Sequence, residues 1–107
     1  MGSAKFEVLM PKNKEQLESL FANIFKRRSQ HIILRILENY LSLEDLLSVL
    51  KKNKDQIGRF RRNKSIVLLS TDYNYEHLPE YIPVAPTQEE AIDIIDFEEI
   101  ERELMFE

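Results

Sequence analysis

Three segments of the chain carry apolar residues at the spacing of an amphipathic helix. In segment 13–28 they lie three or four positions apart and so share one face: Leu17, Leu20, Phe21, Ile24 and Phe25. Segment 42–57 repeats the pattern with four leucines and one isoleucine, and segment 87–104 repeats it less regularly. The pattern predicts three helices that each bury one face.

Each predicted helix begins with a residue that caps helices well, and a second polar residue follows three positions later. The pairs are Asn13 with Gln16, Ser42 with Asp45, and Thr87 with Glu90. The cap accepts hydrogen bonds from backbone amides that have no partner inside the helix, and the second residue reaches back to the cap. We expect the second helix to end at Gly58 and the basic residues after it, because both are typical of helix C-termini.

Four apolar runs lie between these helices. Runs 31–37 and 65–70 are almost continuously apolar, which is typical of central strands in a parallel sheet that helices cover on both faces. Run 6–10 begins with alternating apolar and polar residues, which suits an edge strand. Run 81–85 contains Pro83, which lacks an amide hydrogen, so this strand is also expected at an edge or with a bulge.

Strand and helix segments alternate, and this order favours an α/β fold with right-handed crossovers. We therefore predict a single domain over residues 1–107, with a mostly parallel sheet of about four strands and about three helices. We expect one group of apolar strand residues to be buried: Ile32, Leu34, Ile66 and Leu68.

Composition limits the location and the chemistry of the chain. Its 107 residues include no cysteine, which excludes disulfides and thiolate zinc sites and fits a reducing compartment. No apolar run approaches the roughly 18 residues of a membrane span. No apolar segment of a signal peptide follows Met1, so a cytoplasmic location without membrane contact is expected. Residues 1–4 resemble a cloning remnant because they contain Gly2-Ser3.

The sequence contains few of the parts that a catalytic site needs. With two glycines, it has neither a phosphate-binding Walker loop nor a dinucleotide fingerprint, so no cofactor is expected. Its two histidines are not at metal-binding spacing, and His31 is expected to be a partly exposed structural residue. The carboxylates near the C-terminus are expected mostly to form a solvated helix face: Glu98, Glu99, Glu101 and Glu103. We predict that the protein is not an enzyme.

Charge is distributed unevenly along the chain. Residues 1–86 have a net charge of +4 and residues 87–107 a net charge of −8. The acidic last helix also has more apolar residues than one face of a small sheet readily covers. We expect either complete packing on the domain's own sheet or a residual apolar stripe that forms a homodimer or a helix-in-groove contact.

A basic run with one aromatic follows the second predicted helix: Arg59, Phe60, Arg61, Arg62 and Lys64. Arginines that alternate with an aromatic residue can bind RNA backbone and stack a base. The same run is also typical of a basic helix C-terminus before a turn, and this second interpretation is favoured. The net acidic balance of the chain also argues against general nucleic-acid binding.

Two stretches resemble the STAS family, the small sulphate-transporter and anti-sigma-factor-antagonist domain. Residues 31–47 (HIILRILENYLSLEDLL) look like the family's central strand running into its following helix. Residues 84–95 (VAPTQEEAIDII), with 97–104 behind them, look like its last strand-to-helix junction. With residues 64–71 the likeness covers about 30–104, and it implies a non-catalytic domain that regulates a partner protein.

One feature of that family is absent. Family antagonists carry an Asp-Ser-Ser-Gly turn in which a serine is phosphorylated, whereas here Ser42 stands at the leading Asp and Leu43 and Glu44 stand at the serines. The phospho-acceptor is therefore expected to be lost, while the surface remains suited to a partner. The expected contact residues are the helix start and the loop 71–80 nearby: Ser42, Leu43, Glu44, Asp45, Tyr73, Tyr75 and His77.

The chain bears a closer resemblance to small bacterial proteins that often carry a ribonuclease Z label. That nuclease uses a histidine-rich metal centre, which two isolated histidines do not build. The resemblance implies an accessory protein of RNA processing, which would bind RNA or a nuclease through residues 59–64. A regulatory protein-binding module is the leading hypothesis, and this accessory role is the alternative.

Overall fold

A computed structural model describes residues 5–27 and 30–105 of the chain. Within these residues, four parallel strands form one sheet in the order β1-β2-β3-β4. The strands are β1 (Phe6–Leu9), β2 (His31–Arg35), β3 (Ile66–Leu69) and β4 (Val84–Ala85). The predicted α/β fold is confirmed, and the two edge strands are the two expected from sequence. The remnant proposed for residues 1–4 lies outside the described residues.

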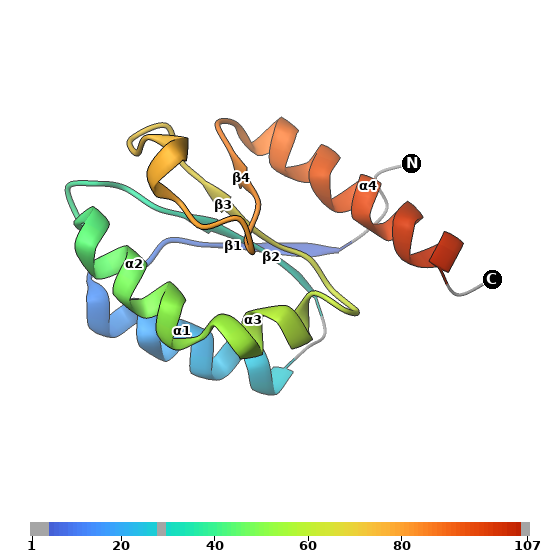
Figure 1. Cartoon of the computed structure of the whole chain (residues 1–107), viewed down its shortest axis with the longest axis horizontal. Coiled ribbons are helices and arrows are strands. Elements are labelled where there is room, and N and C mark those ends of the chain that lie inside the picture. The colour runs from blue at the N-terminus through green and yellow to red at the C-terminus, as the bar shows by residue number, and fades with distance from the viewer. Residues whose placement is uncertain (1–4, 28–29, 106–107) are drawn as a thin grey trace.

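The helices pack on both faces of this sheet (Figure 1). Helices α1 (Lys14–Arg27), α2 (Leu43–Lys52) and α3 (Lys54–Phe60) cover one face, and α4 (Gln88–Met105) crosses the other. A short 3-10 helix, η1 (Tyr75–His77), lies in the connection from β3 to β4. Within residues 5–27 and 30–105, every helix is too short or too polar to span a lipid bilayer.

The second predicted helix differs from the sequence expectation in two ways. It is divided at Asn53, whose backbone leaves the helical region and whose side-chain amide donates to the Val49 carbonyl at 2.8 Å. Gly58 does not end the helix, because α3 continues through it to Phe60, and the helix ends within the basic run, with its C-cap at Arg61. Burial of the Ile57 and Phe60 side chains beneath α3 accounts for the extra turn.

Successive side chains of the central strands point to opposite faces of the sheet and so pack in two separate cores. Ile32, Leu34, Ile66 and Leu68 face α1–α3 and are 5% exposed or less, so their predicted burial is confirmed. The alternate residues of the same strands meet α4 in a smaller core, together with β4 and the first half of that helix: Ile33, Val67, Leu69, Ala85, Ala91 and Ile95. Since each strand is buried on both faces, its sequence has no polar alternation.

Candidate protein-binding surface

Ser42 is the N-cap of α2, as the sequence predicted. Its backbone is extended, with φ −69° and ψ 158°, and its Oγ accepts from the Asp45 N–H at 3.1 Å. Glu44 and Asp45 lie in the first turn, where negative charge offsets the positive end of the helix dipole. Leu43 packs partly against the main core, so Ser42 and Glu44 are the more exposed members of this group.

Two hydrogen bonds join the loop before α2 to the loop after β3. The Tyr73 hydroxyl donates to the Leu41 carbonyl, and the Glu38 N–H donates to the Asp72 carboxylate at 2.8 Å. Tyr73 is 8% exposed. Burial, with the charges of Asp72 and Glu38, raises the pKa of the Tyr73 hydroxyl to about 12, so it stays protonated and donating. Tyr73 is therefore a buried residue that holds the two loops together. The sequence had suggested that it contacts a partner directly.

The joined loops present several polar and aromatic side chains to solvent. Tyr75 is 50% exposed and Tyr40 is 40% exposed, while His77 and Glu44 are also exposed. Asn74 fixes the start of η1, since its Oδ1 accepts from the Glu76 N–H at 2.9 Å. We call residues 38–45 and 71–77 the loop surface; it lies at the end of the sheet where α2 begins (Figure 1). Sequence reasoning missed Tyr40, which lies in a turn two residues before the helix cap.

A small hollow lies at the same end of the sheet. It measures about 240 Å³ and is lined from β2, β3 and the start of α4 by residues that include Arg35, Ser70, Thr71 and Thr87. Small-molecule sites are usually larger, about 300–1,000 Å³. The crevice outside the carboxyl ends of parallel strands is where α/β proteins commonly bind ligands. This hollow lies in that position but is smaller than most small-molecule sites.

The basic run 59–64 does not form one surface. The Phe60 side chain is 4% exposed and packs edge-on against Phe25, with ring centroids 6.2 Å apart. Arg61 donates to the Glu98 carboxylate and to the Tyr81 carbonyl, each at 2.9 Å. An aromatic ring that could stack on a base is therefore not exposed in this run, and one of its arginines is already paired.

Arg61 belongs to a polar network between α4 and the start of β3. Ser65 is fully buried; its Oγ donates to Glu98 at 2.6 Å and accepts from Arg102 at 2.9 Å. The Arg102 guanidinium also donates to the Arg61 carbonyl, at 3.2 and 3.3 Å. The expectation of a solvated face is wrong for Glu98, whose side chain is 14% exposed, whereas Glu101 and Glu103 do face solvent.

His31 completes this network and is more buried than expected. It is 2% exposed, and its Nδ1 accepts from the Ser65 N–H at 2.8 Å. The ring proton is then on Nε2, which lies 3.5 Å from Glu99 Oε1. Burial lowers the pKa of His31, against the opposing effect of Glu99, so the ring is neutral near pH 7. These contacts give both ring nitrogens of His31 a partner and indicate a structural role.

No metal-binding cluster of histidine and carboxylate side chains is found in residues 5–27 and 30–105. Comparisons of the chain with protein-family models, with curated proteins and with solved structures found no match. The likeness to the STAS family therefore stays a prediction, and functional inference depends on the geometry of the chain itself.

Proposed function

We propose that this protein is a non-catalytic regulatory module that docks a partner protein through the loop surface. The observation that carries the proposal is the pair of exposed tyrosines, Tyr40 and Tyr75, on loops that Tyr73 and Asp72 join. Tyrosine contributes a large contact area at low entropic cost, because it has two side-chain torsions. A surface that is ordered before binding also loses less entropy when a partner docks.

The chemistry around the tyrosines also suits a protein partner. Glu44 and Asp45 add negative charge at the start of α2, and His77 adds a polar ring on η1. Aromatic anchors with a polar rim are the usual composition of protein interfaces. The likeness to anti-sigma-factor antagonists supports a partner-binding surface at the same end of the molecule. In that interpretation, Glu44 supplies a constant charge in place of a reversible phosphate.

The test compares three baits in pull-downs from a lysate of the source organism: the wild type, a Tyr40→Ala/Tyr75→Ala variant and an Arg62→Ala control. Tyr40, Tyr75 and Arg62 are exposed, so the fold should be retained in all three baits. We expect the wild type and Arg62→Ala to retain one partner that the double variant loses. With the purified partner, the double variant should bind at least tenfold more weakly, about 1.4 kcal/mol.

The accessory role in RNA processing predicts a different result. A partner that the double variant still binds, that Arg62→Ala loses, and whose affinity falls steeply with salt would contradict the proposal. Steep salt dependence is the mark of phosphate contacts.

A further inference from the structure

The outer face of α4 carries an apolar stripe in which more than half of each side chain is exposed. Ala91 and Ile95 point to the sheet, whereas Phe97, Ile100 and Leu104 lie on the opposite side of the helix and are 61%, 55% and 66% exposed. Their spacing of three and four residues aligns them over about 10 Å of helix. We call Phe97, Ile100 and Leu104 the outer stripe. Of the two expectations for this helix, complete packing on the sheet or a residual apolar stripe, the structure has the second.

Acidic side chains border the outer stripe. Asp93, Glu101 and Glu103 are exposed on the same helix, and Asp96 is partly exposed. The one base of α4, Arg102, is turned inward to Glu98, Glu99 and Ser65. A symmetric dimer through this face would bring the same acids of two chains together, and like charges across an interface are unfavourable. The stripe therefore requires a basic counterpart.

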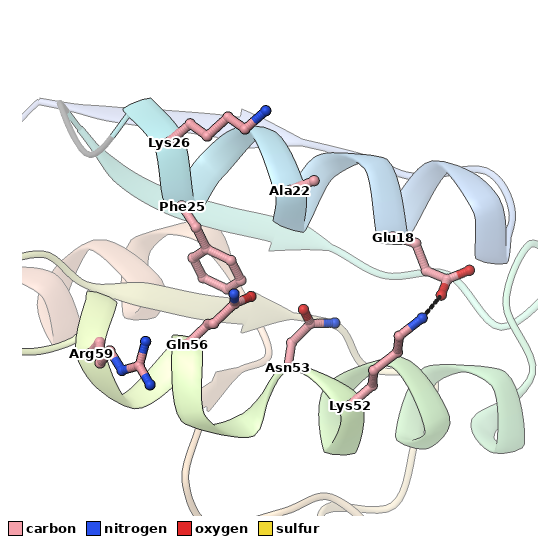
Figure 2. Close-up of a pocket in the computed structure, with 8 residues that line it drawn as sticks. All are labelled: Glu18, Ala22, Phe25, Lys26, Lys52, Asn53, Gln56 and Arg59. Carbon is pink, nitrogen blue, oxygen red and sulfur yellow. Dashed lines mark hydrogen bonds and ion pairs between the residues drawn. The ribbon is translucent and has the colours of Figure 1, made fainter.

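A basic groove lies on the other side of the molecule, between α1 and the α2–α3 pair. It has a volume of about 490 Å³, and its lining residues are shown in Figure 2: Glu18, Ala22, Phe25, Lys26, Lys52, Asn53, Gln56 and Arg59. Phe25 points from α1 toward α3 and gives the groove an aromatic wall. Lys52 and Glu18 form an ion pair at 3.2 Å across one end. The remaining positive charges of the lining are Arg59 and Lys26, whose ammonium extends over α1 away from α3 in Figure 2.

We propose that the basic groove of one chain receives the outer stripe of a second copy. An apolar stripe with acidic borders then meets a groove in which Phe25 and Ala22 supply apolar surface and Lys26 and Arg59 supply positive charge, so the charges are complementary and the apolar surfaces match in part. The two surfaces face away from each other, with α4 above the sheet and α1 and α3 below it (Figure 1). The contact is consequently head-to-tail, and each added chain leaves one free stripe and one free groove.

The first measurement is sedimentation of the full chain over a concentration series. We expect the average mass to rise above the 12.7 kDa of one chain as concentration increases. Added salt should reduce this rise, because it screens exposed charge pairs. A mass that stays at one chain at every concentration overturns the proposal.

The second measurement uses one variant for each surface. Phe97→Asp disrupts the stripe, and Lys26→Glu/Arg59→Glu reverses the charge of the groove. All three residues are exposed, and melting curves verify that both variants stay folded. Each variant alone should associate at least tenfold more weakly than the wild type. Controls at exposed positions outside both surfaces, Met10→Asp and Arg62→Glu, should behave as the wild type.

Mixing the two variants separates this assembly from other dimers. The Phe97→Asp chain still has its groove, and the groove variant still has its stripe, so one productive contact remains. The mixture should form a 1:1 dimer that does not grow further. If the mixture stays monomeric, or if only one variant loses self-association, the stripe and the groove are not partners and the proposal fails.

Discussion

At the scale of single residues, Ser42 shows how much one side chain fixes locally. Its Oγ accepts from the Asp45 amide, and four leucines and a valine follow on the helix that begins there. We predict that Ser42→Ala lowers the free energy of unfolding by about 0.5–2 kcal/mol, because an orphan amide loses its acceptor. Urea denaturation measures the change. Ser48→Ala, in the exposed middle of the same helix, is the control, and an equal loss there would remove the capping explanation.

Substitution of Gly58 is expected to have the opposite effect and to stabilise the protein. Gly58 lies within α3, and a Cβ added there would meet no atom within 4 Å. Gly58→Ala should therefore stabilise the protein by about 0.4–1 kcal/mol, since alanine loses less backbone entropy on folding. Thermal unfolding of the two proteins side by side measures it. A destabilised variant would show that the glycine is required by the local backbone.

At the scale of elements, α4 is attached by polar contacts as well as by apolar ones. Its first half buries Ala91 and Ile95, and its second half is fixed by Glu98 and Arg102 around Ser65. Sequence periodicity predicts the apolar contacts. It does not distinguish a glutamate that faces water from one that pairs with an arginine distant in sequence. The network could not be predicted because its partners come from three segments, around residues 31, 61–65 and 98–102.

The two kinds of glutamate on α4 should respond differently to substitution. Glu98→Gln removes the charge that pairs with Arg61 and Arg102, and should cost about 1–3 kcal/mol of stability, because partly buried charges lose their partner. The matched control, Glu101→Gln, alters an exposed carboxylate on the same helix and should change stability by less than about 0.5 kcal/mol. Chemical denaturation compares them, and similar costs would contradict a structural network.

At the scale of the whole molecule, the central strands β2 and β3 belong to both cores. Ile33 lies under α4 and Ile66 under α1–α3, and both are fully buried. We predict that Ile33→Val and Ile66→Val each cost about 0.5–1.5 kcal/mol and shift the same single unfolding transition. Circular dichroism and tyrosine fluorescence should report coincident curves. Two separate transitions would show that the cores unfold independently.

The loop surface was partly predictable. Ser42 was found from its capping spacing, and Tyr75 and His77 from the irregular stretch between two apolar runs. The separate roles of Tyr73 and Tyr75 were not found, although they are two residues apart. Tyr73 is buried because its hydroxyl reaches Leu41, which is 32 residues earlier in the chain. Tyr40 was missed because it lies in a short turn between Leu37 and Leu41, with no long irregular stretch around it to indicate exposure.

The sequence alone determined the class of fold, the strands that are buried on both faces and the starts of α1, α2 and α4. These features depend on apolar spacing and on caps within a few residues, so local physics decides them. Tertiary structure alone decided that His31 is buried and Glu98 partly buried, that the Phe60 side chain packs in the core, and that Phe97, Ile100 and Leu104 remain exposed. Those outcomes depend on which segments, distant in sequence, pack around a side chain. The spacing of residues along the chain does not determine these contacts.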